Sequence, residues 1–161
     1  MSRVSVITSL ESKMLEALRA LNPGVQVVGL MEVASEGAQK EQDLTSLQVR
    51  VYGLAQINEA QGLYTATAEV RLNVEQAESA NGALFLSAYE AVEIWLEEIM
   101  LGGDCTALDT DRAYVDGLQA TGGDKDFDTT SDTWFAVWTM TLTGRMKPLQ
   151  DEEETQEVNN G

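Results

Sequence analysis

The residues best suited to chemistry are carboxylates that alternate within one short stretch, GGDKDFDTTSD, at residues 122–132. An EF-hand calcium loop uses oxygen ligands at positions one, three, five and nine. The acids that fit those positions are Asp124, Asp126, Asp128 and Asp132. The fit then fails, because Thr129 stands where the loop needs glycine and Phe135 where it needs a bidentate glutamate. We predict a solvated hairpin loop between two strands, and keep the aspartates as candidate ligands of a weak calcium site.

Other catalytic chemistry has little support in the residue types present. The chain has no histidine and a single cysteine, Cys105, so a serine triad, a Cys–His pair and a histidine-based zinc site are excluded. Paired carboxylates could act as the general acid and base of a glycosidase. However, 27 acidic residues form pairs by number alone, and no aromatic platform adjoins them. We therefore expect no enzymatic activity and no cofactor, and we expect Cys105 to be a small buried residue.

The charge balance argues against several kinds of partner. The 27 acidic residues against 10 Lys and Arg give a net charge of -17, and the basic residues are scattered singly. Binding to phosphates needs clustered cations, so nucleic acid and anionic membrane surfaces should both be repelled. The first residues are too polar for a signal peptide, and no apolar run approaches the roughly 20 residues of a membrane span. We expect a protein made and kept in a cytoplasm.

Hydrophobic periodicity predicts a helix and then a strand at the start of the chain. Apolar residues recur at helical spacing over residues 5–21, and Thr8 and Glu11 are spaced as a capping box. The run at 25–33 is rich in branched residues and predicts a strand. The polar connection at 35–43 carries no periodic signal, so we expect a loop there.

Five further elements follow. Residues 46–54 and 63–74 predict long strands, and the second alternates apolar and polar residues cleanly, so one side of the sheet should be covered and the other wet or shared. Residues 82–101 predict a second amphipathic helix, which a glycine pair ends. A short strand at 112–120 and a last long strand at 133–146 complete the chain.

Together these elements predict an α+β fold in a single domain over residues 1–147. The element order is α-β-β-β-α-β-β, with a central, mostly antiparallel sheet flanked by two helices. The remaining residues, 148–161, are poor in apolar side chains and dense in charge. Such a segment cannot offset the cost of ordering its backbone, so we predict a disordered acidic tail.

Apolar residues also stand on faces that should be polar. Two lie among the glutamates of the second helix and two lie opposite the tryptophan face of the last strand; they are Leu86, Ile94, Phe135 and Val137. Single exposed apolar residues need no explanation. Four of them, beside strands that are long for a domain of this size, predict surface covered by a neighbouring subunit. The alternative is a simple two-layer core with no such partner.

The arrangement resembles the tail terminators and allied neck proteins of long-tailed bacteriophages. The resemblance spans residues 1 to about 147 and rests on several stretches taken together. These are the helices SLESKMLEALRAL and ALFLSAYEAVEIWLEEIML, the long strands around LQVRVYGL and TATAEVRLNV, and the closing strands around YVDGLQA and WFAVWTMTLTG. The acidic tail and the acidic segment at 104–132 depart from the family pattern.

The resemblance implies a structural virion protein without chemistry. It implies a hexameric ring, assembled in the host cytoplasm, that caps the tail tube protein and offers a surface to the head-side connector. DNA would pass through the lumen without specific binding, and a net charge of -17 suits that passage because like charge keeps the duplex from adhering.

Two alternative functions stay open on the sequence. One is a neighbouring part of the same machine, such as a head-closure protein or tail tube subunit. The other is an acidic DNA mimic that occupies a host nuclease, for which the row Glu90, Glu93 and Glu97 is the available surface.

Overall fold

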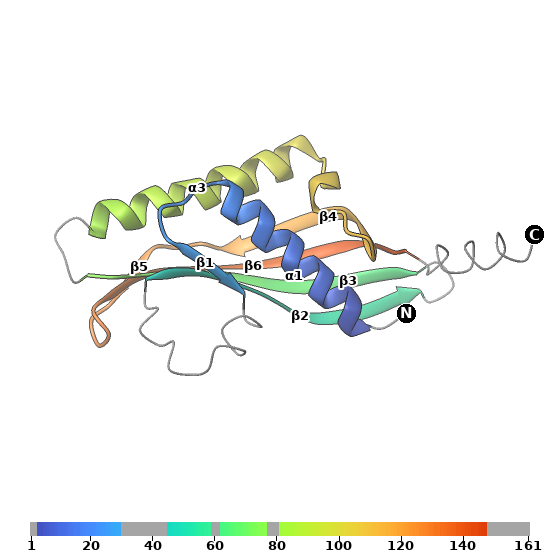
Figure 1. The fold of residues 1–161 in the computed structure, drawn as a ribbon, viewed down its shortest axis with the longest axis horizontal. Helices are drawn as coiled ribbons and strands as arrows, with labels where there is room; N and C mark the ends of the chain where they lie inside the picture. Colours follow the sequence, from blue (N-terminus) through green and yellow to red (C-terminus); the bar gives the residue numbers. More distant parts are fainter. Residues whose placement is uncertain (1–2, 30–44, 59–61, 77–80, 148–161) are drawn as a thin grey trace, which may run out of the picture.

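The computed structural model describes residues 3–29, 45–58, 62–76 and 81–147. In these ranges the chain forms two α-helices, one short 3-10 helix and six strands (Figure 1). The elements are α1 (Arg3–Ala20), β1 (Gln26–Gly29), β2 (Ser46–Asn58), β3 (Leu63–Glu75), α3 (Asn81–Gly102), η2 (Thr106–Leu108), β4 (Ala113–Gly122), β5 (Asp126–Asp128) and β6 (Thr133–Met146). The predicted α+β fold and the order of its main elements are confirmed.

All six strands belong to one sheet, in the order β1-β2-β3-β6-β4, with β5 also paired to β6. Only β1 and β2 run parallel, and the other pairs are antiparallel. The central pair, β3 and β6, runs in register from Leu63 opposite Arg145 to Glu75 opposite Thr133. The sheet is therefore mixed but mostly antiparallel, as the sequence predicts.

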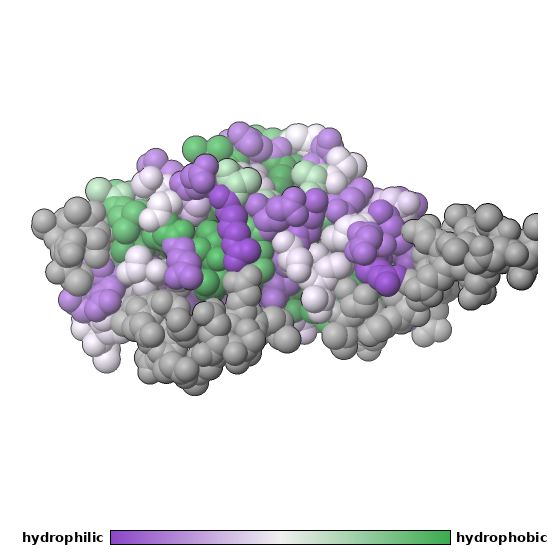
Figure 2. Space-filling model, in the orientation of Figure 1, coloured by the Kyte–Doolittle hydropathy of each residue, from purple (hydrophilic) through white to green (hydrophobic). Residues whose placement is uncertain are grey.

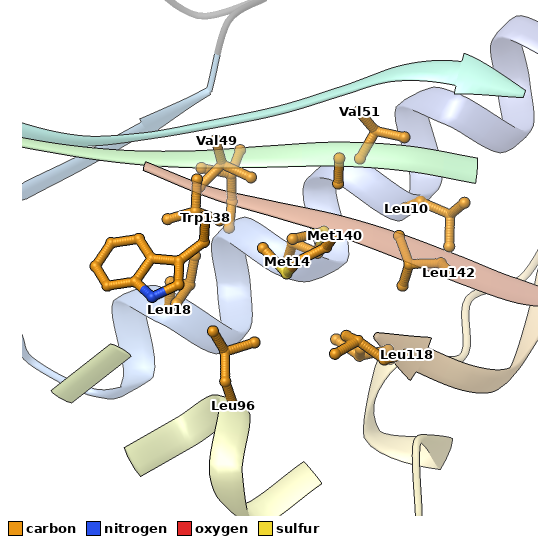
Figure 3. Packing of buried hydrophobic residues seen from close by; sticks show 14 of the residues in the cluster. Leu10, Met14, Leu18, Val49, Val51, Leu96, Leu118, Trp138, Met140 and Leu142 are labelled. Carbon is orange, nitrogen blue, oxygen red and sulfur yellow. The ribbon is translucent and has the colours of Figure 1, made fainter. Parts of the chain in front are cut away.

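Both helices pack on the same face of the sheet, and no helix or strand of the described ranges covers the opposite face, which we call the open face (Figure 1). On β3 every second residue from Tyr64 to Val74 is buried beneath the helices, while the residues between them are only partly buried. Figure 3 shows how the core is filled: on the helical side of β6, Met14 of α1 lies beside Met140 and Leu10 of α1 lies beside Leu142, while Leu96 of α3 faces the sheet. The covered side of the sheet predicted from the alternation is thus the helical side.

Glu11 does not form the predicted capping box. Because α1 begins at Arg3, Glu11 lies inside the helix, and its buried side chain turns toward the sheet. Its carboxylate accepts a hydrogen bond of 3.0 Å from the backbone N–H of Val51. Val51 lies two residues beyond Val49, the last residue of β2 that pairs with β1. The register of β2 against β3 shifts directly after Val51, between Val51 and Gly53. Glu11 thus satisfies a backbone donor that the sheet leaves free.

Glu11→Ala should therefore destabilise the protein by about 1 to 3 kcal/mol, because it leaves a buried N–H without an acceptor. Glu11→Gln keeps an acceptor oxygen and should cost less than the alanine variant. Urea denaturation of both variants measures the difference. Equal losses for Gln and Ala would show that the bond to Val51 contributes little.

Two predictions fall partly or wholly outside the described residues. Of the strand expected at 25–33, the structure describes β1 over Gln26–Gly29, and residues 30–33 lie outside the described residues. The predicted disordered tail at 148–161 also lies outside the described part of the chain. Among the described helices, none is both long and apolar enough to cross a membrane.

Candidate functional site

The acidic stretch at residues 122–132 is part of an interrupted hairpin rather than one loop. Both β4 and β5 pair with β6, and a double glycine, Gly122 and Gly123, separates them. Both glycines have φ of +82°, a conformation that strains other residues. A Cβ on Gly123 would also collide with the indole of Trp138. The prediction of a continuous loop is thus wrong for Asp126–Asp128, where three residues are too few to show an alternating pattern.

The carboxylates of this stretch serve its turns instead of gathering into a metal site. Asp128 accepts hydrogen bonds from the backbone N–H groups of Thr130 at 2.9 Å and Ser131 at 3.4 Å, and these hold its pKa below the ordinary value. Asp126 bonds the N–H of its neighbour Phe127. Within the described ranges no group of three or more His, Cys, Asp and Glu side chains could hold a metal ion. The structure therefore does not bring together the four candidate calcium ligands, Asp124, Asp126, Asp128 and Asp132.

Behind the hairpin, Glu93 of α3 connects the helix to the sheet. One of its carboxylate oxygens accepts a hydrogen bond from the Tyr89 hydroxyl at 2.9 Å, and the other accepts one from Trp138 Nε1 at 3.3 Å. The Tyr89 hydroxyl also lies within hydrogen-bonding distance of the Gly123 carbonyl oxygen. Because the hydroxyl has one proton, it can serve only one of these acceptors at a time. Lys125 lies over the Tyr89 ring, 4.9 Å from its centroid.

These contacts extend into a cluster of aromatic rings between α3 and the hairpin. Ring centroids lie 5.9 Å apart for Phe85 and Tyr89, 5.4 Å for Tyr89 and Trp138, and 4.8 Å for Phe127 and Trp134. Such separations suit offset and tilted aromatic pairs. The hairpin is therefore fixed to the core through its glycines and rings, while its aspartates stay exposed.

Tyr89 should make stability fall at alkaline pH. Burial, with the hydrogen bond to Glu93 and its charge, raises the pKa of Tyr89 to about 12 from 10.0. The folded state thus favours the neutral phenol, so its contribution to stability is complete below pH 10 and is lost as pH rises toward 12. Tyr89→Phe should reduce the loss of unfolding free energy over this window, measured by urea denaturation at several pH values. Burial also raises the pKa of Tyr64. The part of the alkaline loss of stability that comes from Tyr64 should therefore remain in the Tyr89→Phe variant.

Apolar side chains are exposed along the outer side of α3. The four large ones, with their exposed fractions, are Leu86 (46%), Ile94 (55%), Met100 (44%) and Leu101 (79%). Figure 2 shows apolar residues reaching the surface along this helix. Of these, Leu86 and Ile94 were predicted from their positions among the glutamates, whereas Met100 and Leu101 were not. Their signal was present, because two large apolar residues follow the last buried position of the helix directly before Gly102.

The other two predicted interface residues, Phe135 and Val137, lie on the opposite, open face of the sheet. They pair with Asn73 and Arg71, whose side chains alternate with the buried ones of β3. Both are half-buried, and neither belongs to the hydrophobic core. The four predicted residues therefore form two separate apolar areas on opposite sides of the molecule.

The charges of these two faces also differ. The outward charged residues of the described strands on the open face are three arginines and five acids, which gives 3 − 5 = −2; they are Arg50, Arg71, Arg145, Glu69, Glu75, Asp116, Asp126 and Asp128. Arg50 and Glu69 form an ion pair at 3.3 Å. The outer side of α3 instead carries the exposed acids Glu90, Glu97 and Glu98. The outer side of α3 is thus acidic and apolar, whereas the open face carries arginines as well as acids beside its apolar residues.

Cys105 has the surroundings of a structural residue rather than a nucleophile. It is buried, as predicted, and burial together with nearby acids such as Asp104 and Asp109 raises the pKa of its thiol. A raised pKa lowers the fraction of reactive thiolate.

Comparison of the sequence with known protein families and with curated proteins finds no match.

Proposed function

We propose that the protein is a structural subunit of a bacteriophage tail or neck, and that it acts as a tail terminator. In this role identical subunits assemble into a ring. The ring caps the tail tube protein with one surface and presents its other surface to the head-side connector. The subunit needs no enzymatic activity and no cofactor for this role. Its place is the virion, after assembly in the host cytoplasm.

The observation that carries the proposal is the pair of dissimilar faces on opposite sides of one subunit. A closed ring with one subunit type uses heterologous contacts, in which one patch meets a different patch on the next copy. The outer side of α3 offers Leu86 and Ile94 among acids, and the open sheet face offers Phe135 and Val137, with Arg71 beside Val137. Apolar area meets apolar area, and Arg71 beside Val137 meets the acids of α3, which favours one orientation over others.

The acidic charge supports the same role. DNA that passes through a ring adheres to a basic lumen by releasing its counterions. With a net charge of -17 per subunit, the ring leaves the duplex free to move. The expected number of subunits is six, from the resemblance to tail terminators.

The proposal is tested by the mass and shape of the purified protein. Native mass spectrometry and electron microscopy, with and without tail tube protein, should give one defined oligomer with a central hole. A strict monomer under both conditions would contradict the proposal. Double-stranded DNA should not bind in a filter assay at physiological salt.

The DNA-mimic alternative loses support from the position of Glu93. A mimic needs a row of exposed carboxylates, but Glu93 is partly buried and bonded to Tyr89 and Trp138. Among the three residues of the predicted row, only Glu90 and Glu97 are exposed. We therefore expect no inhibition of host nucleases.

A further inference from the structure

A groove lies between the second half of α3 and the edge strand β4. Its volume is about 420 Å³. The residues that line it are Glu93, Leu96, Glu97, Met100, Leu101, Ala120, Gly122 and Trp138. The floor and one wall are thus largely apolar, and two glutamates stand at the rim. The groove does not overlap Phe135 and Val137, which lie on the other face of the sheet.

The strand beside this groove has backbone groups that the described chain does not satisfy. β4 is the last strand of the sheet, so one of its edges has no strand partner. At its start this edge is already bonded: Val115 N–H donates to Asp109 at 2.8 Å, and Ala113 N–H donates to Thr110 at 3.0 Å. These bonds show that the N–H groups of Ala113 and Val115 point away from β6.

The same alternation identifies the free groups farther along β4. The register shift between Val115 and Gly117 keeps Leu118 on the same face as Val115, so their N–H groups point the same way. The N–H and C=O groups of Leu118, Ala120 and Gly122 therefore point to the free edge. This spacing of two residues is the one an added strand uses.

An added strand would place its side chains directly in the groove. Leu118 and Ala120 point to the helical side of the sheet, toward the core. On a strand paired with them, every second side chain points to the same side, where the floor includes Ala120 and the wall includes Leu96 and Leu101. Main-chain bonds would supply affinity and the groove would select apolar side chains.

The charge at the groove selects against acidic segments. Glu93 and Glu97 stand at the rim, and past Gly122 the chain continues with Asp124, while Lys125 is held over Tyr89. The chain's own C-terminal sequence, QDEEETQEV, would meet these acids with like charge. A segment with Lys or Arg beside its apolar residues meets them with opposite charge.

We infer that the edge of β4 and this groove bind an extended segment of another protein, in which every second residue is apolar and basic residues flank the apolar ones at the ends of the segment. The segment adds a strand to β4 through Leu118, Ala120 and Gly122 and inserts its apolar side chains beside Leu96, Met100 and Leu101. This site does not use the open sheet face, but it shares Glu97, Met100 and Leu101 with the outer side of α3, where the proposed ring contact uses Leu86 and Ile94. Peptide binding is measured directly, so its outcome is separate from the mass of the ring.

Synthetic peptides test the inference on the full chain. A fluorescent ten-residue valine–lysine peptide, with valine at every second position of its middle, threonine between the valines and lysines at both ends, should bind, as measured by anisotropy. A valine–glutamate peptide and a glycine–lysine peptide should bind at least about tenfold more weakly, since the first has the wrong charge and the second has no side chains for the groove. Equal binding of the valine–lysine and glycine–lysine peptides would overturn the inference, because charge alone would then account for both.

Ala120→Pro removes one free N–H without removing a bond to β6, and edge strands tolerate proline at such positions. It should weaken binding of the valine–lysine peptide about tenfold or more, whereas the matched control Gln119→Ala, on the other face, should not. If Ala120→Pro fails to fold, amide hydrogen exchange on the wild type gives the same answer: the peptide should slow exchange at Leu118 and Ala120. Unchanged exchange there would overturn the inference. A folded Ala120→Pro variant that no longer self-associates would also overturn the inference, because the edge of β4 would then bind a second copy of this chain and not another protein.

Discussion

Trp138→Ala should cost about 3 to 5 kcal/mol of unfolding free energy, the usual range for removing a buried tryptophan side chain. Trp138 is 1% exposed and lies on β6, at the centre of the contacts between sheet, α3 and hairpin. Its ring packs on Tyr89, its N–H donates to Glu93, and Gly123 packs directly on its indole. For a chain of this length each kcal/mol lowers the melting temperature by roughly 2 to 4 °C, so the midpoint should fall by on the order of 10 °C.

A second substitution separates volume from hydrogen bonding. Trp138→Phe keeps most of the ring but removes the N–H that Glu93 accepts, so it should cost about 1 kcal/mol for the lost bond, in addition to the smaller cavity. Both variants should be melted at one protein concentration, because self-association raises apparent stability. A loss below about 1 kcal/mol for Trp138→Ala would mean that the indole is not packed as described.

The parts of the fold that were predicted are those with long periodic patterns. The strand β3 alternates over its whole length, and β6 begins and ends where its apolar alternation does. The buried stripe of α3, from Phe85 to Ile99, follows from helical spacing alone. Periodicity identifies such elements because each one buries a single face along many residues.

The parts that were missed depend on contacts between distant residues. Glu11 has the spacing of a capping box, and only the position of Val51, 40 residues away, shows what it bonds. Likewise, β5 exists because β6 extends far enough to pair with it beyond the double glycine. The groove beside β4 has no sequence signal, because its walls come from three elements. Turn chemistry was also underestimated, since Asp128 caps a turn where alternating acids also fit a metal loop.

The two-face arrangement predicts a specific outcome when damaged subunits are mixed. Ile94→Glu should disable the outer side of α3, and Val137→Glu should disable the open sheet face, because each places an unpaired charge in an apolar contact. Each variant alone should be a monomer. An equimolar mixture should give dimers and nothing larger, because one contact remains possible: the intact α3 face of Val137→Glu against the intact sheet face of Ile94→Glu.

This mixing experiment separates the possible geometries by mass alone. In a self-complementary contact, where α3 meets α3, Val137→Glu would stay assembled and the mixture would gain no new species. Ser12→Glu, which adds the same charge to an exposed position of α1, is the control and should assemble like the wild type. Circular dichroism confirms that each variant is folded before its mass is interpreted. If both single variants keep the mass of the wild type, neither face takes part in assembly and the ring would have to use other surfaces.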